Sequence, residues 1–148
     1  MDEKDLEELR KIDEKYLELR QKTEDLWKEI NEKDFPSKLT DEFFTIANKA
    51  RLELYEVIHF YESRGESYRF VKECPGYKRA IMLLEKEKKY SDALYLSLQY
   101  KHISEIQKHA LTKINKDRCD KKNKAFMKKL SPEDQEKVLH KQKKKKKH

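Results

Sequence analysis

Glycine, proline and long apolar runs are all scarce in this chain. The 148 residues include two glycines and three prolines, too few for the many turns of an all-β fold. With two glycines, neither a GxGxxG fingerprint nor a P-loop can be formed. No apolar run approaches the roughly 20 residues of a membrane helix, and the acidic first residues lack the apolar segment of a secretory signal. We therefore expect no membrane partner and a cytoplasmic location, or a nuclear one if the source is eukaryotic.

Cysteine is also scarce, and no set of residues points to a reaction. Cys74 and Cys119 are isolated, as expected of a reduced compartment, and we expect no disulfide between them. His102 and His109 complete a conceivable zinc set, but CxxC, HxxxH and HExxH spacings are absent. A Cys–His nucleophilic pair stays open, since nothing selects one. We expect no enzyme, no catalytic residue, no metal and no cofactor.

Charged residues, in contrast, are abundant and unevenly placed. They make up 44% of the chain, against about 25% in average proteins. Residues 1–34 hold thirteen acidic and eight basic residues, whereas residues 113–148 hold five acidic and fifteen basic residues. The basic end favours an anionic partner, such as nucleic acid, anionic lipid or an acidic protein face, and the chain's own acidic first helix is an alternative. Hydrophobic residues, at 36%, predict a thin core, and the scarcity of glycine and proline predicts an all-α fold, a small helical bundle.

Residues 1–34 carry the clearest periodic pattern, which predicts an amphipathic, coiled-coil-like helix over residues 5–33. Its apolar positions alternate at spacings of three and four, forming a heptad seam: Leu9, Ile12, Tyr16, Leu19, Thr23, Leu26 and Ile30. At 1.5 Å per residue such a helix is roughly 43 Å long. The seam suits contact with the protein's own helices or self-association through a coiled coil, and both interpretations stay open.

Residues 35–117 are expected to form the helical core. After the break at Pro36, Thr40 is the predicted N-cap of a helix that ends near Gly65, where a left-handed residue is favoured. Pro75 suits the first turn of a helix reaching about Lys88. A further helix, capped by Ser91, is predicted to continue to about residue 115.

Residues 118–148 are basic and are predicted to be weakly helical, then disordered. Ser131 begins a last weak helix that holds only Val138 and Leu139 as apolar positions. From Lys141 onward, six lysines in eight residues repel one another, which predicts a disordered tail. The sequence therefore predicts about five helices in all.

Residues 77–100 resemble one tetratricopeptide repeat. In that family an aromatic residue, a Leu-Gly pair and a Tyr mark the first helix, and an Ala followed four residues later by a Phe marks the second. The matching positions here are Tyr77, Ala80-Ile81, Leu84, Ala93 and Ser97. Ile81 replaces the small Gly and Ser97 replaces the Phe, so the two helices would lie further apart or cross at another angle. The resemblance implies a helical hairpin of that family, and an ordinary helical hairpin is the alternative.

These patterns favour a non-enzymatic helical interaction or adaptor module that binds another protein's helix or extended segment. The candidate contact residues lie on the first helix and the hairpin: Leu9, Ile12, Tyr16, Leu19, Tyr77, Leu84, Tyr95 and Tyr100. Each of them also suits a core position.

The alternative is a small nucleic-acid-associated protein that binds through its basic C-terminal region. The candidate residues are Lys121, Lys122, Lys124, Lys128, Lys129, Lys143, Lys144, Lys145, Lys146 and Lys147. No aromatic residue stands among the terminal lysines to stack on bases, so binding would follow phosphate charge and not sequence. A solvated terminal segment without a partner explains the same lysines.

Overall fold

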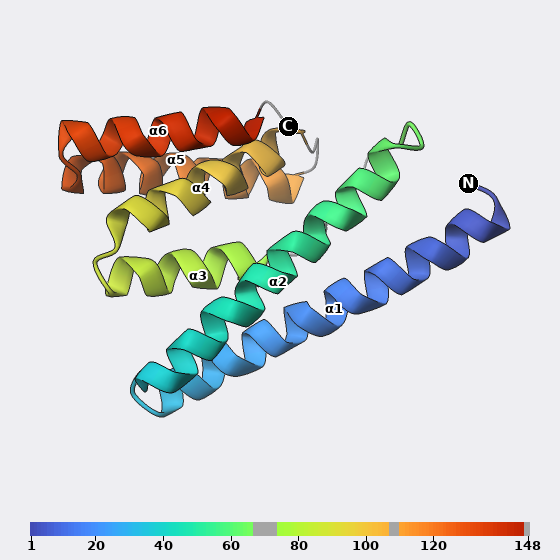
Figure 1. The fold of residues 1–148 in the computed structure, drawn as a ribbon, viewed down its shortest axis with the longest axis horizontal. Helices are drawn as coiled ribbons and strands as arrows, with labels where there is room; N and C mark the ends of the chain where they lie inside the picture. Colours follow the sequence, from blue (N-terminus) through green and yellow to red (C-terminus); the bar gives the residue numbers. More distant parts are fainter. Residues whose placement is uncertain (67–73, 107–109, 147–148) are drawn as a thin grey trace. The chain divides into compact units, whose positions relative to one another are not determined.

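Six helices make up the described part of this all-helical protein, and no strand occurs there. The computed structural model describes residues 1–66, 74–106 and 110–146. The helices are α1 (Glu3–Glu32), α2 (Ser37–Glu62), α3 (Pro75–Lys86), α4 (Tyr90–Ile106), α5 (Ala110–Lys129) and α6 (Pro132–Lys146) (Figure 1). The expected all-α class is confirmed, with one helix more than the five predicted.

The described residues form two compact units. The first comprises residues 1–66 and 74–79, and the second comprises residues 80–106 and 110–146. Helix α3 begins in the first unit and continues in the second from Ala80. These units group residues by contact, whereas the predicted divisions at residues 34 and 117 follow composition, and those divisions stay a prediction.

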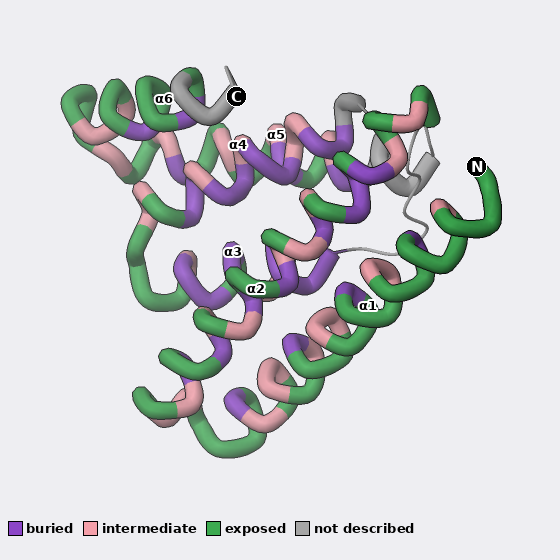
Figure 2. Tube along the Cα trace, turned by 45° about the vertical axis from the view of Figure 1, so that its right-hand side comes forward, coloured by how far each residue is buried: buried purple, intermediate pink, exposed green. Residues whose placement is uncertain are grey.

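In the first unit, α1 and α2 form a long antiparallel pair (Figure 1). Four positions of the heptad seam are buried, each seven residues after the last: Leu9, Tyr16, Thr23 and Ile30. Figure 2 shows these buried positions recurring along one side of α1. The polar member, Thr23, donates its hydroxyl to the Leu19 carbonyl oxygen at 2.7 Å, which satisfies the group inside the pair. The four buried positions are therefore covered by α2 of the same chain, whereas Ile12, Leu19 and Leu26 are half-buried.

The turn between α1 and α2 is shorter than predicted, because α2 begins before the predicted N-cap. Helix α2 begins at Ser37, because Pro36 supplies the extended residue before it and accepts the Thr40 N–H at 3.0 Å. Thr40 is therefore inside the first turn and is not the predicted N-cap. Asp34 and Phe35 both have left-handed backbones, with φ of 59° and 58°. At the other end of α2, Gly65 has φ of 70°, which confirms the left-handed residue expected there.

In the second unit, α5 packs against α4, and α6 packs against α4 beside it. The core includes the almost fully buried Leu94, Ile103 and Phe126. Helices α3 and α4 are joined by a three-residue turn in which Lys88 has φ of 59°. This turn agrees with the predicted tight link between two helices. Kinship with tetratricopeptide repeats stays a prediction.

The C-terminal region is more helical than its composition predicts. Residues 118–129, the later part of α5, and residues 132–146 are helical where we expected weak helix and then a disordered tail, and residues 147–148 lie outside the described part. Sparse burial explains the difference: Cys119 and Phe126 of α5, and Val138 and Gln142 of α6, are buried at spacings of seven and four. Few apolar residues suffice when they all face the same neighbour.

Candidate protein-interaction groove

The second unit has an open groove of about 550 Å³ between α4, α5 and α6. Four apolar side chains line it: Leu94, Leu98, Met127 and Leu139. Five polar or charged side chains complete it: Lys101, Asp120, Asn123, Lys124 and Lys128. The volume lies within the range of about 300–1,000 Å³ that is usual for ligand sites. We call this site the α4–α5–α6 groove.

The apolar side of the groove comes chiefly from α4. Leu94 is fully buried and Leu98 half-buried, and their i,i+4 spacing places both on one face of that helix. Leu139 of α6 keeps 39% of its surface exposed, although it is one of only two apolar side chains on its helix after Pro132. The groove therefore presents apolar surface to solvent.

The charged side of the groove comes chiefly from α5. Lys101 of α4 lies 2.6 Å from the Asp120 carboxylate, and its hydrogen bond lowers the pKa of Asp120 below the ordinary value. Lys124 and Lys128 are exposed and form no ion pair with the residues that the structure describes. The single acid of the groove is thus paired with Lys101 and also attracts Lys124, so the groove holds one acid and three lysines.

Asn123 adds a buried acceptor. Its Oδ1 atom is shielded from solvent and receives no hydrogen bond from any described residue. A buried polar atom without a partner costs about 1–3 kcal/mol. The wall of the groove therefore contains one unsatisfied polar group beside the apolar and cationic ones.

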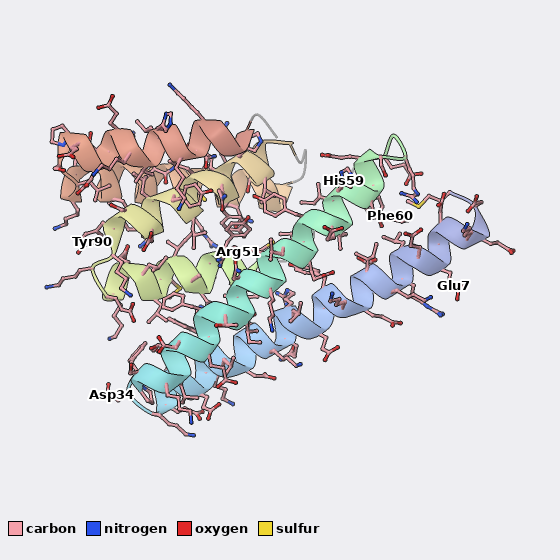
Figure 3. The ribbon with its side chains drawn as sticks, viewed as in Figure 1. Glu7, Asp34, Arg51, His59, Phe60 and Tyr90 are labelled. Carbon is pink, nitrogen blue, oxygen red and sulfur yellow. The ribbon has the colours of Figure 1, made fainter. Side chains whose placement is uncertain are left out.

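The first unit has a polar cluster at the start of α3, which links α3 to α2 and has a structural role. Arg51, about midway along α2 in Figure 3, donates to the Gly76 carbonyl oxygen at 2.7 Å and lies 5.7 Å from the Tyr77 ring centroid. The Tyr77 hydroxyl donates to the Tyr55 hydroxyl at 3.0 Å. Burial lowers the pKa of Arg51 and raises the pKa of Tyr77 well above its ordinary value. The small space bordering this cluster does not admit a water molecule.

The predicted protein-contact residues lie elsewhere than in the groove. Five are buried within the two units: Leu9, Tyr16, Tyr77, Leu84 and Tyr100. Three are half-buried: Ile12, Leu19 and Tyr95. The Lys141 ammonium lies 4.1 Å from the Tyr95 ring centroid, a cation–π contact between α6 and α4. A binding role for these eight residues stays a prediction.

The predicted nucleic-acid residues are partly gathered on one helix. Five of them are exposed on α5: Lys121, Lys122, Lys124, Lys128 and Lys129. Lys122 is paired with Glu85 at 2.8 Å. Lys143 is exposed on α6, and the side chains of Lys144 to Lys147 lie outside the described part. Lys124 and Lys128 are the two predicted residues that the structure places in the groove.

Sequence reasoning missed the apolar half of the groove. Leu94 and Leu98 were visible as members of a helix stripe, yet the same stripe also contains core residues. Their distinction from the core arises only when α5 and α6 take their places beside α4. The pairing of Lys101 with Asp120 has no sequence signal, because these residues are nineteen positions apart on different helices.

The remaining chemistry of the described part is limited. Cys74 and Cys119 are free and buried, and burial raises the pKa of the Cys119 thiol to about 11. Within residues 1–66, 74–106 and 110–146, no three His, Cys, Asp or Glu side chains stand close enough to hold a metal ion, and His109 is outside this part. None of the helices described is long and apolar enough to cross a membrane. Comparison with protein-family models, curated proteins and solved structures finds no match.

Proposed function

We propose that this chain is a non-enzymatic helical interaction module that binds a helical segment of another protein in the α4–α5–α6 groove. The observation that carries the proposal is the open groove itself, in which Leu98, Met127 and Leu139 remain partly exposed on three different helices. Binding a helix in an apolar groove is a recurring mode of peptide recognition, with anchors spaced three or four residues apart.

The hairpin of α3 and α4 lends a second line of support. Its likeness to one tetratricopeptide repeat rests on Tyr77, Ala80, Leu84 and Ala93, with departures at Ile81 and Ser97. A repeat of that kind cannot bury its apolar face alone and needs a neighbouring element. Here we propose that α5 and α6 serve as that neighbour and leave the groove between them.

A display library of helical peptides, selected on the immobilised full-length protein, tests this function. Leu139→Glu places a charge on the groove's exposed apolar residue and is expected to weaken the selected peptides at least tenfold. Leu52→Glu is the matched control, because Leu52 is similarly exposed, at 55% against 39%, and lies on α2. Peptides that bind both variants equally well, or no enrichment at all, would refute a groove function.

A second candidate function is non-specific nucleic-acid binding through α5. The specific observation is that Lys121, Lys124, Lys128 and Lys129 are exposed and make no ion pair with described residues. Four neutralised phosphates predict a log–log salt slope of about −4, without preference for a sequence. Fluorescence anisotropy with mixed DNA and RNA measures that slope, and no binding in about 50 mM salt ends this candidate.

A further inference from the structure

We propose that the partner of the α4–α5–α6 groove is an acidic amphipathic helix, in which carboxylates flank a short apolar stripe. This inference rests on the proposed function and adds the chemistry of the bound segment. Its basis is the presence of partly exposed apolar side chains and two exposed lysines in the same groove.

Accessible apolar and cationic side chains line the same groove. Leu98 of α4, Met127 of α5 and Leu139 of α6 are partly exposed, whereas Leu94 is fully buried. Lys124 and Lys128 stand four residues apart on α5 and span about 6 Å along that helix. A helix lying in the groove would therefore cover the apolar side chains and meet ammonium groups at its own i,i+4 repeat.

The charges of the groove favour an anionic occupant. Asp120 is hydrogen-bonded to Lys101 and also attracts Lys124, whose charge helps to lower the pKa of Asp120, so one carboxylate faces three lysines of the groove. Lys124 and Lys128 repel each other along one helix face, and carboxylates between them would relieve the repulsion. The described residues of the second unit hold eighteen basic and nine acidic residues. A basic partner would thus be repelled at the groove and by the unit around it.

The apolar side distinguishes an acidic helix from a nucleic acid. Phosphates would satisfy Lys124 and Lys128, but they would leave Leu98, Met127 and Leu139 uncovered. An amphipathic helix covers both sides at once. The observations therefore favour a peptide, and binding of nucleic acid in place of peptide is an outcome of the test.

The acidic α1 of a second copy fits this description less well. Four of the seven seam positions of α1 are already buried against α2, and the exposed apolar residues of that helix, Leu6 and Leu17, stand eleven positions apart. That separation exceeds the four-residue repeat of the groove. The partner is accordingly a segment of another protein with closely spaced apolar anchors.

Three designed helical peptides test the inference on the full-length protein. All three carry leucines at positions i, i+4 and i+7, and their flanking positions are Glu in the first, Gln in the second and Lys in the third. By fluorescence anisotropy at 50 mM salt, the Glu peptide is expected to bind at least tenfold more tightly than the Gln peptide. The Lys peptide is expected to be weakest, and the differences should shrink at 500 mM salt.

Charge reversal at the groove supplies the decisive variant. Lys124→Glu with Lys128→Glu is expected to invert the order, so that the Lys peptide binds best. Lys121→Glu with Lys129→Glu is the matched control, because it changes the net charge equally on exposed positions of α5 that do not line the groove. This control is expected to retain the original order, and circular dichroism verifies that both variants keep their helix content.

The outcomes separate the two proposals. If all three peptides bind equally, and Leu139→Glu weakens all three, the groove function holds and the acidic partner is refuted. If both double variants lose the preference equally, general charge and not the groove is responsible, which also overturns the inference. If no peptide binds, and DNA binds or light scattering shows a dimer through the groove, both proposals fail.

Discussion

Gly76 stands at a close approach of α3 to α2 in the first unit. A Cβ atom built on it would lie 3.0 Å from the Ala47 carbonyl oxygen and 3.3 Å from Cγ of Arg51. The oxygen belongs to the backbone of α2 and cannot turn aside. Gly76→Ala is therefore expected to destabilise the protein by about 1–3 kcal/mol, more than the 0.5–1 kcal/mol that alanine gains as a helix former.

Thermal unfolding followed by circular dichroism measures this effect. Gly65→Asn is the control, since no atom lies within 4 Å of a Cβ there and asparagine tolerates the left-handed backbone. A melting temperature of Gly76→Ala at or above that of the wild type would contradict the close approach of α2 and α3.

The turn at Asp34 and Phe35 stores strain in two left-handed residues that are not glycine. Asp34 is labelled at the α1–α2 turn in Figure 3. Asp34→Gly relieves one of them and is expected to stabilise the protein by about 0.5–1 kcal/mol, after the entropy of glycine in the unfolded chain is subtracted. Urea unfolding measures the change.

Phe35→Gly is the informative comparison, because it relieves a similar strain but removes a ring that lies 6.4 Å from the Trp27 ring in an edge-to-face contact. We expect this variant to be less stable than Asp34→Gly. Equal gains from the two variants would show that the ring contact contributes nothing.

The Cys119 thiol is expected to couple stability to alkaline pH. Burial raises its pKa from 9.0 to about 11. Because the folded-state pKa is the higher one, the thiol's contribution is fully present below pH 9. It is lost as the pH rises toward 11, by about 2–3 kcal/mol in total.

Urea unfolding of wild type and Cys119→Ala between pH 8 and 11 isolates this contribution from other titrating groups. The difference in unfolding free energy between the two proteins should shrink as the pH rises. A difference that stays constant over that range would contradict a shifted thiol.

At the scale of helices, few buried residues hold α6 in place, and one of them has a polar atom without a hydrogen bond. Gln142 is buried, and its Oε1 atom receives no hydrogen bond from any described residue. Gln142→Leu removes this unsatisfied group and adds apolar surface, so we expect a gain of about 1 kcal/mol. Hydrogen exchange of the α6 amides should slow by a similar free energy.

Gln135→Leu is the matched control on the same helix. The Gln135 amide donates to the Met127 and Leu130 carbonyl oxygens, at 2.8 and 3.2 Å, and so satisfies the C-terminal end of α5. Its loss should cost about 1 kcal/mol. The same change of residue type should therefore act in opposite directions at the two positions.

The sequence predicted some helices well because their apolar positions repeat over many turns. The seam from Leu9 to Ile30 has no other consistent explanation, and Pro36 and Pro75 mark boundaries by covalent geometry. In contrast, α6 has a composition typical of disorder, and Val138 and Gln142 are its buried residues in the described part. The groove could not be predicted from the sequence, because Leu98 and Lys124 line the same space only after α4, α5 and α6 have packed together.

At the scale of the whole molecule, the two units differ in the sign of their net charge, and each unit has its own core. The described residues of the first unit hold fourteen basic and nineteen acidic residues, whereas the second unit has twice as many bases as acids. Each unit also has its own fully buried residues, such as Ile30 in the first and Ile103 in the second. The units are therefore expected to lose structure separately.

Ile30→Ala and Ile103→Ala test this separation, since each creates a cavity that should cost about 2–5 kcal/mol. Hydrogen exchange should accelerate in α1 and α2 for the first variant, and in α4 and α5 for the second. Equal acceleration in all four helices after either substitution would instead indicate one cooperative molecule.

The strained α1–α2 turn has a consequence at high protein concentration. In a domain-swapped dimer, α1 of one molecule would pack on α2 of a second molecule and meet the same buried partners as in the monomer. The opened turn would release the left-handed backbones of Asp34 and Phe35. Short hinges under strain favour such domain swapping. A relaxed turn, as in Asp34→Gly, should accordingly slow the exchange of arms between molecules.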